Sequence, residues 1–205
     1  MSKKLKFKLN NQEFQLPITS YRESTWGGSL EKYIHMSAKN TASVIKQYVK
    51  SNFPNVVCSA TSDVYSGGSS VRVHVCKKDG SSLDEKTFKE IQKWKWILSG
   101  GSFNGMEDIY EYREDDVTTE KGMALKYFPS YVFIENKPSW GSKEYWMESW
   151  REWIEITTSG NMTENQQVWT NNVVNKYGGW LGYNKQYMSK TVLKNIDELM
   201  LNVKL

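Results

Sequence analysis

Seven basic side chains in the middle of the chain suggest the binding of an anion. They are Arg72, Lys77, Lys78, Lys86, Lys89, Lys93 and Lys95. Three of these lysines share one face of a helix, because they are spaced i, i+3 and i+7 along residues 86–93. Lysine and arginine bind phosphates, and exposed aromatic rings stack on unpaired bases. Since Lys93-Trp94-Lys95-Trp96 interleaves both types, we expect a nucleic-acid-binding surface here. The alternative is an ordinary solvated face with Trp94 in the core.

Carboxylates in the second half of the chain suggest a different chemistry, which is metal-dependent cleavage of nucleic acid. The acidic stretch 107–120 includes Asp108, Asp115 and Asp116. Nucleases of the restriction type hold Mg²⁺ with an acid followed by a Glu-x-Lys triplet on a strand, and Glu135-Asn136-Lys137 matches that triplet. Asp116, Glu135 and Lys137 are therefore candidates for a metal site, although such triplets are common by chance. The acidic stretch is otherwise a solvated loop or a surface that binds a basic host protein.

Cysteine and histidine offer weaker signals. Cys58, His74 and Cys76 would form half of a zinc site, or the two cysteines a disulfide, if the hairpin that carries them is symmetric about Gly67. A fourth ligand is missing, and we expect two buried thiols. Neither cysteine begins a predicted helix, so a Cys–His nucleophile is not favoured. The glycines at 67–68 lead into a strand and not into a helix, which indicates a hairpin tip and not a phosphate loop. We assign no catalytic or metal-binding residue and expect no cofactor.

An α-β-β-α unit over residues 37–99 must position the basic residues. A helix is predicted from Ser37 to about Asn52, with an apolar face at spacings of three and four that includes Ile45. Its lysines, which fall largely off that face and should be solvated, are Lys39, Lys46 and Lys50. Strands at 56–61 and 71–76 form a hairpin. A capping box at 82–85 then starts a second helix that ends near residue 98.

The flanking regions have their own patterns. Residues 1–36 read as a lead-in that contains a short half-buried strand at 5–9. A strand is predicted at 131–135, and helices at 142–156 and 190–200. The first of these helices aligns Trp146, Trp150 and Trp153, and this stripe is either core or a docking face on which Trp146 binds a partner.

Composition limits the protein class. The chain has 205 residues, 39% of them hydrophobic, which is enough for a core. It contains no apolar stretch of the roughly 20 residues that a membrane span needs, and no apolar segment follows the basic N-terminus as in a secretory signal. Residues 1–106 carry 16 basic and 8 acidic side chains, whereas residues 107–205 carry 11 and 15. This asymmetry favours an anionic partner for the first half, or is simply a solubilising surface.

Residues 34–137 contain a further set of motifs. They are Lys50, Phe53 and Pro54 at a helix end, the hairpin Ser66-Gly67-Gly68-Ser69-Ser70 before Val71-Arg72-Val73, and two later motifs. The later motifs are Phe103, Gly105, Met106 and Asp108 with Tyr110 and Tyr112, and the strand Tyr131-Val132-Phe133. In these motifs, residues 34–137 resemble a known family, the large polyvalent protein associated domain, type 29. The resemblance implies a bacteriophage or mobile-element setting, in which such domains accompany proteins that enter a bacterial host and sometimes blunt its defences. It implies no catalytic residues.

We therefore expect an α+β protein, in which an α-β-β-α module with a small antiparallel sheet is followed by a Trp-rich helical C-terminal part. The expected divisions are 1–36, 37–137 and 138–205, or one continuous domain. The expected function is that of a non-catalytic accessory protein in the cytoplasm of a bacterial host, which binds nucleic acid or a host defence protein and no membrane. A small metal-dependent nuclease and a virion or structural accessory protein are the alternatives.

Overall fold

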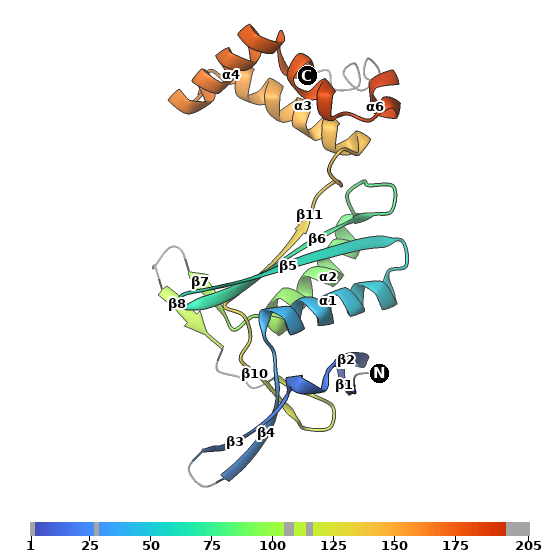
Figure 1. Ribbon diagram of the computed structural model, residues 1–205, viewed down its shortest axis with the longest axis vertical. Coiled ribbons are helices and arrows are strands. Elements are labelled where there is room, and N and C mark those ends of the chain that lie inside the picture. The colour runs from blue at the N-terminus through green and yellow to red at the C-terminus, as the bar shows by residue number, and fades with distance from the viewer. Residues whose placement is uncertain (1–2, 27–28, 105–108, 114–116, 196–205) are drawn as a thin grey trace. The chain divides into compact units, whose positions relative to one another are not determined.

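The computed structural model describes residues 3–26, 29–104, 109–113 and 117–195 (Figure 1). The chain forms two compact units. The first comprises residues 1–75 and 83–136, and the second comprises residues 76–82 and 137–205. Both are built as the α+β expectation requires, with small sheets in the first unit and helices in the second. Among the described residues, no helix is long and apolar enough to cross a membrane.

The α-β-β-α module is present in the first unit. Helix α1 (Ala38–Asn52) leads to strands β5 (Val56–Tyr65) and β6 (Gly68–Lys77), and helix α2 (Glu85–Leu98) follows. Both helices lie on one face of the sheet (Figure 1). The alternation of β6 explains this packing, because Val71, Val73 and Val75 are fully buried toward the helices. From the helices, Ile45 and Ile91 join the same core.

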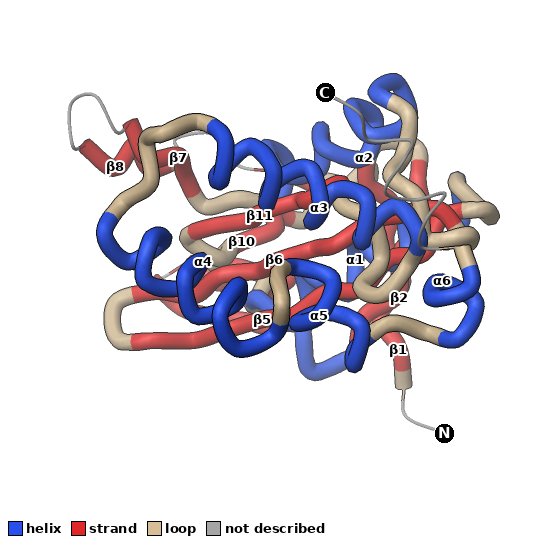
Figure 2. The backbone as a smooth tube through the Cα atoms, turned by 90° about the horizontal axis from the view of Figure 1, so that it is seen from above, coloured by secondary structure: helices blue, strands red, loops and turns tan. Residues whose placement is uncertain are grey.

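The sheet of this module is mixed, which corrects the antiparallel expectation. Strand β11 (Tyr131–Asn136) pairs with β6 in parallel, with Val132 opposite Val71 and Ile134 opposite Val73, and the strand order is β11-β6-β5 (Figure 2). The reason is the path of the chain between β6 and β11. After β6 the chain runs back along the helix-covered face of the sheet through α2, and it then enters β11 beside β6 in the same direction, so the two strands are parallel. Within this sheet, β5 and β6 are joined by a two-residue turn and form the predicted hairpin.

The cap of α2 also differs from the predicted capping box. Asp84 is the N-cap, and its carboxylate accepts a hydrogen bond from the backbone N–H of Thr87 at 2.9 Å. The backbone N–H of Ser82 instead donates to Glu144 at 2.8 Å. The helix therefore begins at Glu85, because aspartate caps a helix as well as serine does and lies one turn before Thr87.

The N-terminal residues belong to the first unit and help to build its core. Strands β1 (Lys4–Leu9) and β2 (Gln12–Pro17) form a hairpin, which confirms the predicted half-buried strand. Its inward side chains, all buried in the main core, are Phe7, Leu9, Phe14 and Leu16. A short 3-10 helix (Ile18–Ser20) then leads to β3 (Tyr21–Trp26) and β4 (Ser29–His35).

Short strands link α2 to β11. Strands β7 (Gly101–Asn104) and β8 (Ile109–Tyr112) pair antiparallel with each other. Strands β9 (Val117–Thr118) and β10 (Ala124–Lys126) join β3 and β4 in a second sheet of order β3-β4-β10-β9. The turn between β9 and β10 lies next to the β1–β2 hairpin, because the backbone N–H of Glu120 donates to the carbonyl of Lys8 at 3.0 Å.

The second unit is the Trp-rich helical part that the sequence predicts. Helix α3 (Lys143–Thr158) matches the expected helix, whereas α4 (Glu164–Tyr177) lies in a polar stretch for which no helix was expected. Short helices follow: α5 (Trp180–Asn184), a 3-10 turn (Lys185–Tyr187) and α6 (Lys190–Lys194). The second half of the predicted helix 190–200 lies outside the described residues.

Candidate nucleic-acid interface

Helix α1 carries an exposed row of lysines. Its N-cap is Ser37, whose Oγ accepts a hydrogen bond from the backbone N–H of Asn40 at 3.3 Å. Because the apolar side of the helix is buried against the sheet, the opposite side faces solvent. That side carries Lys39, Lys46 and Lys50, all exposed.

These lysines line a groove between α1 and the edge strand β5, which we call the α1 groove. One part has a volume of about 430 Å³ and is lined by Lys39, Lys46 and Lys50 together with Ala60 and Ser62 of β5, among others. An adjoining part of about 260 Å³ shares two of these lysines. Its further lining residues, which are mostly apolar, are Phe53, Pro54, Val56 and Cys58. The α1 groove thus has lysines along its α1 wall, while its β5 wall is uncharged.

The charged side chains of the α1 groove are all positive. Between Glu31 and Asp63 the chain contains four lysines and no aspartate or glutamate. Within the part of the chain that the structure describes, no carboxylate forms an ion pair with Lys39, Lys46 or Lys50. Such a surface attracts anions, and screening by salt weakens that attraction.

The predicted lysine face of α2 is exposed but is partly neutralised by its own helix. The ammonium of Lys89 lies 2.5 Å from Glu85, and that of Lys93 lies 2.6 Å from Glu90. Lys86 is exposed beside them. We call these three lysines the α2 ridge. Exposed pairs of this kind are worth little to stability, but each brings a negative charge close to the lysine that a phosphate would have to contact.

The aromatic residues next to the α2 ridge have separate roles. Trp94 is buried in the core at 3% exposure, as the alternative interpretation holds, whereas Trp96 is 58% exposed. The ammonium of Lys95 lies 4.7 Å from the centre of the Trp96 ring, which is a cation–π contact. Of the two tryptophans in the interleaved stretch, only Trp96 is placed to stack on a base.

The other predicted cations do not join the α2 ridge. Arg72 lies on the sheet face that is opposite the helices, where its Nε is 3.5 Å from a Glu135 carboxylate oxygen and its guanidinium is 5.8 Å from the centre of the Phe133 ring. Lys77, the last residue of β6, and Lys78, in the turn that follows, are exposed and belong to the second unit. The seven cations are therefore spread over several surfaces and do not form one cluster.

Of the four predicted partner-binding residues, the structure describes only Trp146. Asp108, Asp115 and Asp116 lie outside the described residues. Trp146 is 3% exposed in the core of the helical unit, where its ring is 6.2 Å from that of Trp180. Trp146 is therefore a core residue, whereas a docking role would require a residue at the surface. The same spacing of apolar side chains serves a core and a docking face, and here it serves the core.

The structure does not assemble a metal site from the described residues, in which no group of three or more His, Cys, Asp and Glu side chains is placed to hold an ion. Glu135 is instead close to Arg72, as described above. Cys58 packs against the main core, whereas the sulfur of Cys76 lies 3.3 Å from Ser139 Oγ, and neither cysteine is in a disulfide. Because the hairpin turn is centred between Ser66 and Gly67, the pairing shifts by one residue, which turns the two cysteines to opposite faces.

Sequence reasoning missed the α1 groove because it treated the α1 lysines as ordinary solvated side chains. The signal was present in the charge pattern, as the long stretch between Glu31 and Asp63 without any acidic residue. Helix α2 carries more lysines than α1, so the clustering of lysines in the sequence points to α2. A search for lysines without neighbouring carboxylates would have found α1.

Comparison with known proteins identifies the family. No curated protein and no solved structure matches this chain. A family model described as large polyvalent protein associated domain 29 matches residues 36–139, about half of the chain. This match covers the whole α-β-β-α module, including the α1 groove, the α2 ridge and β11. The chain therefore belongs to the large polyvalent protein associated domain 29 family.

Proposed function

We propose that this protein is a non-catalytic accessory protein of a phage or another mobile element, and that it binds nucleic acid along the α1 groove in the cytoplasm of the bacterial host. Family membership supports the mobile-element setting. One observation carries the binding activity: Lys39, Lys46 and Lys50 share one exposed face of α1, along a groove, with no carboxylate paired to them among the described residues.

The length of this row suits a phosphate backbone. Lys39 and Lys50 are eleven positions apart on one helix, which corresponds to about 16 Å at 1.5 Å per residue. A strand of double-helical DNA presents one phosphate per roughly 3.4 Å of axis, so the row spans about five phosphates. Three ammonium groups distributed over that length can contact separate phosphates and not compete for one.

The row also carries a cost that binding would offset. Lys46 and Lys50 are one turn apart, and like charges at this spacing destabilise a helix by about 0.2–0.5 kcal/mol. A glutamate at either position would remove this cost. Departures from local stability rules tend to occur at functional sites, so the all-lysine face favours a binding role over a merely solvated one.

The test compares two matched triple variants. In one, Lys39, Lys46 and Lys50 become Gln; in the other, Lys86, Lys89 and Lys93 become Gln. Both remove three positive charges, so the two variants have the same net charge. Fluorescence anisotropy with single- and double-stranded DNA and RNA, between roughly 50 and 200 mM salt, measures the affinity and its salt dependence.

We expect the α1 variant to make the slope of log K against log salt less steep by about 2.7 on duplex DNA and by about 2.1 on a single strand, corresponding to three lost phosphate contacts. The α2 variant should change the slope less. Absence of binding at low salt, or equal losses in both variants, would contradict the proposal. Adding Mg²⁺ to the same samples tests the nuclease alternative. If the oligonucleotides were shortened, the function would be cleavage and not binding alone.

A further inference from the structure

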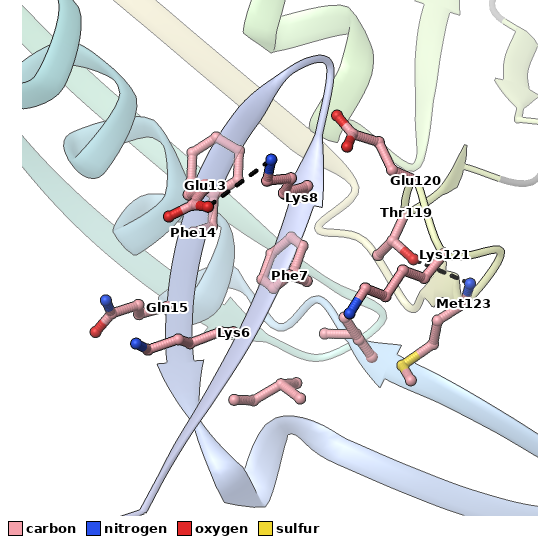
Figure 3. Close-up of a pocket in the computed structure, with 12 residues that line it drawn as sticks. Lys6, Phe7, Lys8, Glu13, Phe14, Gln15, Thr119, Glu120, Lys121 and Met123 are labelled. Carbon is pink, nitrogen blue, oxygen red and sulfur yellow. Dashed lines mark hydrogen bonds and ion pairs between the residues drawn. The ribbon is translucent and has the colours of Figure 1, made fainter.

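A separate pocket lies between the β1–β2 hairpin and the turn 119–123, and Figure 3 shows it with its lining side chains. Its volume is about 220 Å³. Leu5 and Phe7 of β1, Ile34 of β4 and Met123 give it a largely apolar interior. Ile34 is fully buried and Phe7 is 9% exposed, so the interior of the pocket merges with the main core.

The walls of this pocket are held in place by the backbone. In the turn 119–123, the N–H of Thr119 donates to the carbonyl of Met123 at 2.8 Å, and the N–H of Met123 donates to the hydroxyl of Thr119 at 3.0 Å. Gly122 has a φ of +76°, which favours glycine at that position. The turn is joined to the hairpin by Glu120, whose carboxylate accepts a hydrogen bond from the backbone N–H of Asn11 at 3.0 Å. The pocket is therefore formed before any ligand arrives.

The mouth of the pocket has an excess of positive charge. Of its two carboxylates, Glu13 is 3.8 Å from Lys8, and Glu120 is held by Asn11. Lys6 and Lys121 also lie at the mouth, and neither forms an ion pair with a carboxylate within the described part of the chain. The Lys121 side chain extends from the turn toward the hairpin (Figure 3). An anionic group at the mouth would find these two ammonium groups while an apolar group entered below.

We propose that this pocket binds a small amphipathic carboxylate, with its short apolar body against Phe7 and Met123 and its carboxylate at Lys121. The size of the pocket limits the ligand: about 220 Å³ is the space of roughly seven water molecules at about 30 Å³ each. A nucleotide or a drug-sized molecule needs a larger pocket, of about 300–1,000 Å³. This site does not depend on nucleic-acid binding at the α1 groove.

The experiment uses octanoate as the probe and follows methyl resonances of the intact protein by NMR. Octanoate should bind saturably and shift the methyl signals of Leu5, Ile34 and Met123. Acetate carries the anionic head alone, and octylammonium carries the apolar body with the opposite charge, so neither should bind at this site. Saturable binding of octylammonium equal to that of octanoate, or no saturable binding of octanoate, would overturn the proposal.

Variants locate the site. Lys121→Met should weaken octanoate binding about tenfold, since a charge-assisted hydrogen bond is lost, whereas Lys4→Met, an exposed lysine of β1 outside the lining, is the control. Leu5→Trp should fill the pocket and abolish binding, with circular dichroism to verify folding. Equal effects of Lys121→Met and Lys4→Met would refute the assignment even if Leu5→Trp did not fold. Nucleic-acid affinity, measured on Lys121→Met, should stay unchanged, which keeps failure of this site distinct from failure of the α1 groove.

Discussion

Helices α1 and α2 pack on the same face of the same sheet, yet they present opposite arrangements of charge. Helix α2 begins with the carboxylate of Asp84 as its cap, and Glu85 and Glu90 neutralise two of its lysines. Helix α1 begins with the neutral cap Ser37 and contains no acidic residue at all. We therefore expect the number of lysines on a helix to be a poor measure of its attraction for phosphate. What matters is how many of those lysines lack a nearby carboxylate.

The largest expected effect on nucleic-acid affinity comes from reversing one charge on each helix. Lys46→Glu places a carboxylate in the middle of the α1 groove, next to the phosphates that the groove is proposed to bind. We expect nucleic-acid affinity at low salt to fall about tenfold or more, because like charges brought together are strongly repelled. Lys89→Glu is the matched variant on α2 and should cost clearly less. Fluorescence anisotropy measures both; a larger loss for Lys89→Glu would place the interface on α2.

The sequence was sufficient to predict several of the main elements but not how they pair. The bounds of α1 and α3 follow closely from periodicity and caps, and the presence of the hairpin follows from its turn, although both of its strands are longer than predicted. The parallel register of β11 against β6 depends on a crossover of more than fifty residues between them, and no local pattern encodes it. Helix α4 was missed because its sequence is polar and its apolar periodicity is weak, although Thr163 and Gln166 form a capping box.

The candidate site was predictable only in part, for a related reason. The sequence shows that α2 is rich in lysine, and the structure confirms that the α2 ridge is exposed. It does not show that Lys39, Lys46 and Lys50 lie along a groove, because the groove needs β5 as its second wall. Likewise, an aromatic stripe does not distinguish core from surface until its neighbours are known, as Trp146 shows.

A second prediction removes the acids of α2 in place of its lysines. In the double variant Glu85→Gln and Glu90→Gln, Lys89 and Lys93 lose their carboxylate partners. If neighbouring carboxylates are what limits the α2 ridge, affinity for nucleic acid should rise about two- to fivefold at low salt, and its salt slope should steepen by about 1. Glu13→Gln with Glu164→Gln makes the same change in net charge at residues outside α1 and α2 and serves as the control. If affinity rose equally in this control, the gain would come from the change in net charge and not from the loss of the carboxylates next to Lys89 and Lys93.

A third prediction exchanges the caps of the two helices. Aspartate and serine are about equally good N-caps, so Ser37→Asp changes mainly the charge at the N-terminus of α1. Favourable interaction with the helix dipole should stabilise the fold by about 0.3–1 kcal/mol, and the added negative charge should weaken nucleic-acid binding. Asp84→Ser on α2 should destabilise the fold by a similar amount. Urea unfolding at low salt measures the free energy, and the two effects should shrink together as salt is added.

The smallest expected effect concerns pH and lies on the α1 side alone. His35 is the last residue of β4, two residues before the N-cap of α1, and its carbonyl accepts a hydrogen bond from the Asn40 side chain of α1 at 2.7 Å. Burial, and secondly the charge of Arg22, lower the pKa of His35 below its usual 6.5. The unfolded chain therefore binds a proton more readily than the folded one, so this contribution to stability is present above about pH 6.5 and is lost as the pH falls toward and below the folded pKa.

Thermal unfolding between neutral and mildly acidic pH should accordingly show a loss of stability that is smaller in His35→Gln, which has no ionisable group at this position. His74→Gln removes the other histidine of the chain and is the matched control. If His74→Gln flattened the pH dependence and His35→Gln did not, the titrating group would lie on β6 and not at the end of β4 next to α1. In that case the two helices would still differ in charge, but the pH dependence of stability would no longer be assigned to His35.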